Sequence, residues 1–179
     1  SGDNEISSDI IKSLNDYSST KFFGYDKLKC EGKCLSIIKN NKLSNNLKET
    51  EKGDLIFDTT VFYAESGGQK GDIGEIKSDN VEVKVLDCKK INVAEKVMFM
   101  HKVKVIKGEI NIADVLNLEV DIENRKEISS HHSSTHLLHE ALREEFGINV
   151  KQKGSLVSNE KLRFDFNLNH PIQLNILKK

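Results

Sequence analysis

The sequence predicts an α+β fold, in which a strand-rich part, a small antiparallel barrel or sandwich, precedes one prominent helix and two further strands. Three observations predict it: helical spacing of apolar residues near the N-terminus, alternating apolar and polar residues after it, and helical spacing again in residues 129–147. The 179 residues, 37% hydrophobic and 31% charged, suffice for one domain or two small ones. We divide them into a connector helix and linker (residues 1–20), a strand-rich part (residues 21–123) and a part that contains the prominent helix (residues 124–179).

The composition excludes several classes of protein. A net charge of −1 argues against binding nucleic acid by charge alone, because such domains usually carry a clear basic excess. No apolar run approaches the roughly 20 residues of a membrane helix, and the N-terminus lacks a signal-peptide layout. The three cysteines, Cys30, Cys34 and Cys88, cannot all pair within one chain and fit a reducing compartment. We expect a soluble, cytoplasmic protein with free thiols and no membrane partner.

The first element is an amphipathic helix over residues 5–18. Its apolar residues recur at helical spacing, and Ser7 and Ser8 are available to cap its start. These apolar residues are Ile6, Ile10, Ile11, Leu14 and Tyr17. Two readings stay open: the apolar face is covered by a partner outside this chain, or the segment is a frayed terminal helix.

Strands follow, because the apolar period changes from 3.6 to 2. Three segments alternate clearly: Val81, Val83 and Val85; Val103 and Val105; Leu116, Leu118, Val120 and Ile122. Turn residues separate the strands at Asn40–Asn41, Gly53–Asp54, Gly67–Gly68, Gly71–Asp72, residues 78–80 and Gly108. Short strands separated by turn residues in this way are typical of a small barrel or sandwich.

The prominent helix covers residues 129–147. Ser129 and Ser130 are candidate N-caps, and Gly147 suits a left-handed C-terminal position. Its apolar stripe consists of Leu138, Ala141, Leu142 and Phe146. Two strands, SLV and RFDFNL, follow and are expected to pack on the helix.

Two histidines on this helix, His132 and His136, have the i, i+4 spacing at which two imidazoles reach one Zn²⁺. The spacing alone is weak, since partly exposed helix histidines are commoner, and Ser133 stands where a zinc protease carries its general base. His139, one turn on, suits packing or a position behind the ligands. Cys30 and Cys34 form CxxxC on strand-like sequence, where about 13 Å separates them, so we interpret them as ordinary small buried or half-buried residues.

A glycine-bearing loop lies within residues 58–74, DTTVFYAESGGQKGDIG. Its paired glycines, flanked by Glu65, Gln69 and Asp72, would let backbone N–H groups approach a ligand. The alternative is a plain hairpin loop. It is not a phosphate loop, because GxxxxGK[ST] and GxGxxG are both absent.

Four motifs in order resemble the editing region of alanyl-tRNA synthetase: FGY, DTTVFYAESGGQKGDIG, HHSSTHLLHEALREEFG and QKGSLVSNEKLRFDF. The resemblance covers residues 21–170. It implies that residues 21–123 form a small antiparallel β-barrel subdomain and that residues 124–179 form the N-terminal part of an α/β editing core. This core would hydrolyse serine or glycine wrongly esterified to alanine tRNA, a step needed because an alanine pocket discriminates weakly against both. Its implied partners are the mischarged tRNA and the remaining domains of the same synthetase.

The resemblance also implies the site residues. His132 and His136 correspond to zinc ligands, and Thr60, Gln69, Thr135 and Gln152 correspond to the amino-acid pocket and its glycine loop. No residue is an evident general base, so a metal-bound hydroxide or the tRNA itself would accept the proton. ATP and magnesium would serve only the aminoacylation domain, which the resemblance places before residue 1.

Two departures from the family pattern are visible. His131 replaces the asparagine that usually precedes the first zinc histidine. The resemblance also ends in the editing core, before the Cys-x-x-x-His pair that completes the family's zinc site, so it implies a truncated fragment that holds zinc weakly.

Two other functions remain open. A free-standing alanyl-tRNA deacylase is the alternative enzyme, against which FYAESGGQ and FGY argue. A non-catalytic module that binds RNA or positions a neighbouring domain is the alternative of another class. Four cations near the predicted site could touch phosphates or form a solvated face: Lys151, Lys153, Lys161 and Arg163.

Overall fold

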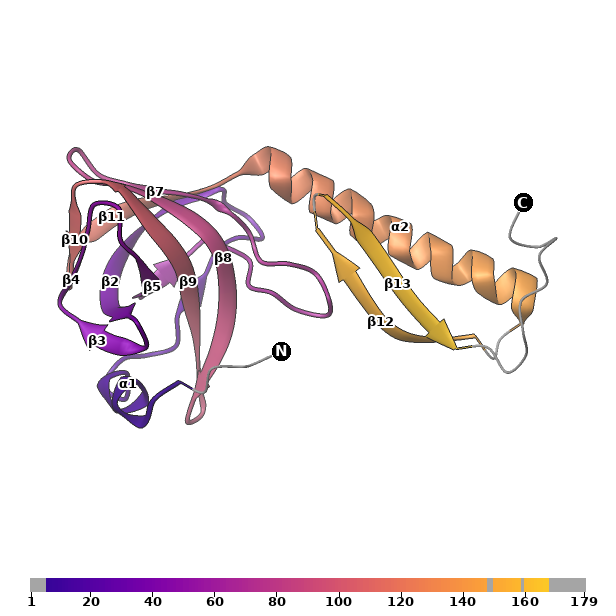
Figure 1. Cartoon of the computed structure of the whole chain (residues 1–179), viewed down its shortest axis with the longest axis horizontal. Helices are drawn as coiled ribbons and strands as arrows, with labels where there is room; N and C mark the ends of the chain where they lie inside the picture. The colour runs from indigo at the N-terminus through magenta and orange to yellow at the C-terminus, as the bar shows by residue number, and fades with distance from the viewer. Residues whose placement is uncertain (1–5, 148–149, 159, 168–179) are drawn as a thin grey trace. The chain divides into compact units, whose positions relative to one another are not determined.

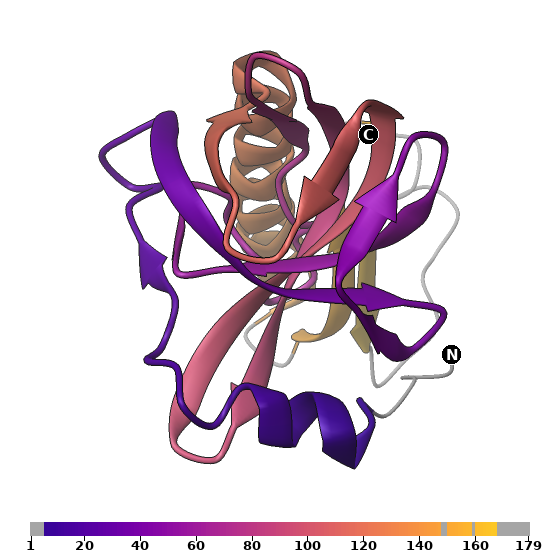
Figure 2. The same cartoon turned by 90° about the vertical axis from the view of Figure 1, so that its left-hand side faces the viewer.

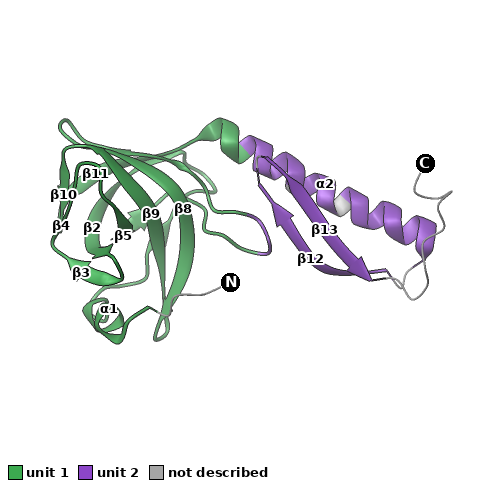
Figure 3. Ribbon diagram, in the orientation of Figure 1, with its two compact units in different colours: residues 1–66, 70–125 green, residues 67–69, 126–179 purple. Residues whose placement is uncertain are grey.

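The computed structural model describes residues 6–147, 150–158 and 160–167, apart from the side chains of His132 and His136. The chain forms two compact units (Figure 3). The first comprises residues 1–66 and 70–125, and the second comprises residues 67–69 and 126–179. Each unit is described by itself below.

The first unit is built on a seven-stranded antiparallel sheet (Figure 1). Its strand order is β11-β7-β8-β9-β5-β2-β3, and β11 also pairs with β2, so that six of the strands close into a ring (Figure 2). The strands are β2 (Lys29–Lys39), β3 (Lys42–Ser44), β5 (Lys52–Phe57), β7 (Gly74–Lys77), β8 (Glu82–Val93), β9 (Lys96–Lys107) and β11 (Val115–Val120). Two short pairs complete the unit: β1 (Lys21–Phe22) with β6 (Thr59–Thr60), and β4 (Asn46–Lys48) with β10 (Glu109–Asn111).

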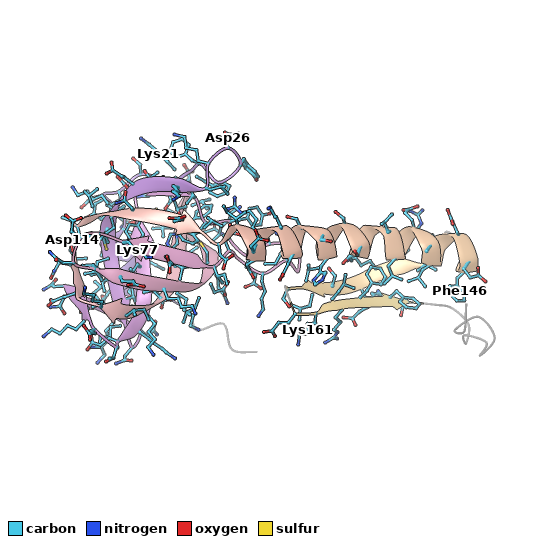
Figure 4. The ribbon with its side chains drawn as sticks, turned by 90° about the horizontal axis from the view of Figure 1, so that it is seen from above. Lys21, Asp26, Lys77, Asp114, Phe146 and Lys161 are labelled. Atoms are coloured by element: carbon cyan, nitrogen blue, oxygen red, sulfur yellow. The ribbon has the colours of Figure 1, made fainter. Side chains whose placement is uncertain are left out.

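The alternation in the sequence becomes the core of this sheet. Val83, Val85, Val103 and Val105 are fully buried in one cluster, while charged residues between them, such as Lys84, face solvent. The predicted α+β class is confirmed by this antiparallel sheet together with one long helix. The side chains of Lys21, in β1, and Asp26, in the turn that follows it, project outward (Figure 4).

Most of the predicted turns connect strands. Asn40 and Asn41 join β2 to β3 with φ of 51° and 60°, the left-handed conformation of a tight hairpin. The prediction of a turn at Gly53–Asp54 is wrong, because both residues lie within β5. Gly53 serves close approach instead: a Cβ there would lie 2.6 Å from the carbonyl oxygen of Ile38.

The N-terminal helix, α1 (Ser8–Ser13), is shorter than predicted and packs on its own chain. Ile10 and Leu14 are buried in a second apolar cluster with residues of the sheet: Ile38, Ile56, Ile91, Val93 and Met98. Both readings made from the sequence, an outside partner and a frayed end, are therefore wrong. Ser7 occupies the N-cap without a side-chain bond, and the Lys96 ammonium binds the carbonyls of Leu14 (3.1 Å) and Tyr17 (2.6 Å).

The long helix, α2 (Ile122–Phe146), begins earlier than predicted. The Asp121 carboxylate caps it by accepting from the backbone N–H of Asn124 (3.0 Å), so Ser129 and Ser130 lie inside the helix. Ile122 starts the helix rather than ending a strand. Gly147 ends α2 with φ of 90°, as predicted.

The second unit contains most of α2 and the antiparallel hairpin of β12 (Lys151–Val157) and β13 (Leu162–Asn167). The stripe of α2 that is at least half-buried differs from the predicted one, since Leu138 is 41% exposed and Ala141 is also exposed. It follows helical spacing through Ile128, His131, Thr135, His139, Leu142 and Phe146. The predicted strand residue Leu168 lies outside the described residues. None of the helices in the described parts is long and apolar enough to cross a membrane.

Candidate functional site

The glycine loop and β12 form an open pocket in the second unit. Its volume is about 370 Å³, and it is lined by Gly67, Gly68, Gln152, Lys153, Gly154 and Ser155. The Gly68 carbonyl accepts from the backbone N–H of Val157 (2.8 Å), and Gln69 forms a parallel bridge with Val157. The loop is therefore held against the strand by backbone pairing, so the reading as a plain hairpin loop does not describe it.

Gly68 is required by this pairing. Its φ of 82° is left-handed, and a Cβ there would lie 2.1 Å from the carbonyl oxygen of Ser155. Gly67 shares the left-handed conformation, with φ of 58°, but a Cβ there would meet nothing within 4 Å. Gly68 thus allows the backbone to approach β12 closely, whereas Gly67 only allows the chain to turn.

A bulge in β12 shapes the opposite wall of the pocket. Gln152 pairs with Phe166 and Gly154 pairs with Asp165, so that Lys153 is an extra residue between two ladder positions. Gln152 is exposed, which leaves its amide available to a bound group. Of the predicted pocket residues, Gln69 and Gln152 belong to this meeting of loop and strand.

Thr135 lies on the buried stripe of α2. It is 4% exposed, and its hydroxyl donates to the carbonyl oxygen of His131 (3.0 Å). His131 and His139 on either side each place a ring nitrogen near a backbone carbonyl, those of Ser158 (2.5 Å) and Val150 (3.4 Å). The His139 ring also lies 5.5 Å from that of Phe164, a contact that suits a packing role.

The two predicted zinc ligands, His132 and His136, are one turn apart in α2, but their side chains lie outside the described residues. Among the described residues, no group of three or more His, Cys, Asp and Glu side chains could hold a metal ion. Cys30 and Cys34 lie in β2 as free thiols, and burial raises the pKa of Cys34 to about 12. This agrees with the interpretation of the CxxxC pair as structural.

Thr60, the remaining predicted pocket residue, belongs to the first unit. It is fully buried, and its Oγ1 lies 2.7 Å from Nε2 of His101 and accepts from the N–H of Phe62 (3.1 Å). The other ring nitrogen, Nδ1, lies 3.0 Å from the carbonyl oxygen of Leu55. Sequence reasoning missed His101, although alternation along β9 places it on the buried face with Val103.

Asp72 is a structural residue, contrary to a role around a ligand. It is 3% exposed, accepts from the N–H of Tyr63 (2.7 Å) and pairs with Arg125. A separate pocket of about 670 Å³ in the first unit contains none of the predicted site residues. Its walls include Glu75, Glu82, Lys84, Ile106, Glu119 and Ile122.

Comparison of the sequence with known proteins assigns the chain to one family. The family model described as tRNA synthetases class II (A) matches residues 2–124. Alanine–tRNA ligases are 43% identical over 161 residues in Thermoanaerobacter sp. (strain X514), 49% over 150 residues in Fusobacterium nucleatum and 42% over 153 residues in Coxiella burnetii. The chain belongs to the alanyl-tRNA synthetase family.

The matches cover 84–88% of this chain. The chain in turn spans only 16–17% of the length of those relatives. The family is thus shown for most of the chain.

Proposed function

We propose that this chain is the editing region of an alanyl-tRNA synthetase, which hydrolyses the ester joining serine or glycine to alanine tRNA. One observation carries the proposal: Gly67–Gln69 pairs with β12 and forms a pocket beside Gln152, in the unit whose helix bears His132, Thr135 and His136. The loop, the strand and the helix come from three separate sequence motifs. Membership of the family supports the same function.

The chemistry of the substrates explains why hydrolysis is needed. A pocket built for alanine cannot strongly reject glycine, which is smaller, or serine, which adds only a hydroxyl. Binding alone would leave a substantial rate of mischarging. A second, hydrolytic site removes the wrong products.

The chain's own residues suit the task of holding an ester. The left-handed glycines bring backbone close to a ligand, and the exposed Gln152 amide offers both donors and an acceptor. The Thr135 hydroxyl donates its hydrogen to the backbone carbonyl oxygen of His131. Toward a substrate, the Thr135 hydroxyl oxygen would therefore act as an acceptor. Positioning of the ester and a water molecule would then be the main contribution of these side chains.

His132 and His136 would hold zinc. Two neutral imidazoles at i, i+4 are a donor set that zinc accepts, and further ligands would come from outside the described residues. Bound zinc would supply Lewis-acid polarisation of the ester or the water. We place this activity in the cytoplasm, a reducing compartment in which the three cysteines would remain free thiols.

The test is hydrolysis of serine and glycine esters of alanine tRNA by the full-length protein, with the correct alanine ester as control. Replacing His132 or His136 with Ala should reduce hydrolysis at least a hundredfold and remove zinc measured by elemental analysis. Replacing Glu144, an exposed residue of the same helix, with Ala is the matched control. Unchanged hydrolysis in both histidine variants would overturn the zinc assignment, and tRNA binding without hydrolysis of either ester would favour a non-catalytic module.

A further inference from the structure

The FGY segment is a sequence motif to which the proposed function assigns no role. It follows β1 within the first unit and consists of Phe23, Gly24 and Tyr25. Tyr25 is 82% exposed and Phe23 is 39% exposed, whereas Gly24 between them is buried. The motif therefore presents two aromatic side chains to solvent on either side of a buried residue.

The backbone of this turn is held in place by the rest of the first unit. The Gly24 carbonyl accepts from Nη1 of Arg125 (2.8 Å), and a Cβ at Gly24 would lie 2.3 Å from the carbonyl oxygen of Val61. The Phe23 carbonyl accepts from the backbone N–H of Lys27 (2.9 Å), which closes the turn. Because the turn is already ordered, it would lose little conformational freedom on binding a partner.

The Tyr25 ring is supported from below, although most of it is uncovered. It lies edge-to-face with the ring of Phe22, with 5.0 Å between the centroids and 76° between the planes. Phe22 is half-buried and in turn stacks on Phe99, with 5.3 Å between the centroids. An exposed ring on a rigid support is suited to stacking against a nucleobase, since every base offers a flat π-face.

The charges of this segment are mainly positive. Residues 21–29 contain three lysines and one aspartate, in a chain whose net charge is −1. The Lys27 ammonium lies 5.3 Å from the centroid of the Phe23 ring. Lys21 is exposed on the preceding strand, and its side chain projects outward as that of Asp26 does (Figure 4). Two lysines thus accompany the two exposed rings, as an RNA backbone requires.

The other candidate surface of the first unit has the opposite charge. The pocket of about 670 Å³ is lined by five acidic residues and one lysine, Lys84. Phosphates would be repelled there. A protein partner suits the FGY segment less well than RNA does, because aromatic hot spots of protein interfaces lie in apolar, desolvated surroundings. The residues that follow Tyr25 are instead the exposed Asp26 and Lys27.

We propose that Phe23 and Tyr25 form a stacking surface for an unpaired nucleotide of tRNA, with Lys21 and Lys27 contacting its phosphates. The inference rests on the proposed function only in naming tRNA as the RNA. It gives the first unit a place of RNA contact made by that unit alone. It also explains how a chain with no basic excess holds RNA: a few local contacts replace a broad positive surface.

The test measures RNA binding by the 179-residue chain. The probes are alanine tRNA, a short unpaired oligoribonucleotide, and the same oligoribonucleotide annealed into a duplex. Tyr25→Ala removes the ring, Tyr25→Phe keeps it, and Lys27→Gln removes one positive charge. Leu43→Ala and Lys42→Gln are the matched controls, because both residues are exposed on β3.

The unpaired oligoribonucleotide should bind more tightly than the duplex, whose bases are already stacked on one another. Tyr25→Ala should weaken the binding of unpaired RNA and of tRNA about tenfold, while Tyr25→Phe and both controls should retain it. Lys27→Gln should reduce the slope of log affinity against log salt concentration by about 0.7, the value for one phosphate of a single strand. Unchanged affinity in Tyr25→Ala, or equal binding of the duplex, would overturn the proposal and assign the exposed rings to a protein partner.

A fluorescence measurement separates this proposal from the proposed function. The chain contains no tryptophan, so Tyr25→Trp introduces a single reporter, whose emission should be quenched by unpaired RNA and not by the duplex. Quenching, without hydrolysis of either ester by the full-length protein, would support the stacking surface and overturn the editing function. Hydrolysis without quenching would overturn the stacking surface alone.

Discussion

Arg125 donates to both carboxylate oxygens of Asp72, with Nε 3.1 Å from Oδ2. The same guanidinium donates to the carbonyls of Gly24 and Val61, each at 2.8 Å. Asp72 in turn accepts from the N–H of Tyr63. One charged pair therefore joins the first turn of α2 to the FGY segment and to both ends of the loop that follows β6, within the first unit.

Removing the carboxylate should destabilise the first unit. Asp72→Ala leaves a guanidinium, only 22% exposed, facing two carbonyls without its counter-ion, so we expect a loss of about 3 kcal/mol in the free energy of unfolding. Urea unfolding followed by circular dichroism measures it. Glu75→Ala breaks an exposed pair with Lys77 and should leave stability almost unchanged. Equal effects of the two substitutions would show that burial does not distinguish these pairs.

The buried imidazole of His101 predicts a pH dependence of stability. Its pKa falls from 6.5 to about 4 on folding, so the unfolded chain binds a proton between these values that the folded chain does not. The free energy of unfolding should therefore have its full value above pH 6.5 and fall by roughly 3 kcal/mol as the pH drops to 4. Denaturation at several pH values tests this, with His101→Gln expected to lose that part of the slope. An identical slope in the variant would exclude His101 as its source.

The two glycines of the loop should respond differently to substitution. Gly68→Ala combines left-handed backbone strain with a collision at the Ser155 carbonyl, and should detach the loop from β12 and abolish editing. Gly67→Ala carries the strain alone, of about 1 kcal/mol, and should retain most of the activity. Exchange at the Val157 amide, which donates to Gly68, reports the detachment directly. Protection of that amide in Gly68→Ala would refute the collision.

The docking of α1 predicts a cost for truncating its buried face. Leu14 is fully buried, so Leu14→Ala should lower the free energy of unfolding by about 3 kcal/mol. Lys12 lies on the exposed side, and Lys12→Ala is the control. A loss below 0.5 kcal/mol in Leu14→Ala would indicate a helix that does not pack on the sheet in solution.

Strands and helices with one buried face could be predicted from the sequence, because their apolar residues recur with the period of a strand or of a helix. The alternation around Val83 and Val103 located β8 and β9, and Gly147 marked the end of α2. The start of α2 was misplaced because Ser129 and Ser130 are common capping residues, whereas the cap is Asp121, at the end of a strand-like run. Local chemistry allowed both starts, and tertiary packing selected one.

The features that could not be predicted from the sequence depend on contacts between residues that are far apart in the sequence. The pair of His101 and Thr60 and the pair of Arg125 and Asp72 join segments that no local pattern connects. The pairing of Gly68 with β12 is of the same kind. Turn chemistry indicated the glycine loop and the family resemblance implied Gln152, but only the folded chain brings them to one pocket.

The closure of the sheet ring constrains the order in which the molecule can form. Cys30 of β2 pairs with Leu118 of β11, so the ring stays open until synthesis has passed β11. Until then β2 and β7 each offer an unpaired edge to neighbouring chains. Non-local pairing of this kind folds slowly, on a scale of about milliseconds to seconds. Pairing of β11 with β2 and β7 therefore removes the last open edges of the ring, the kind of surface at which partly folded chains aggregate.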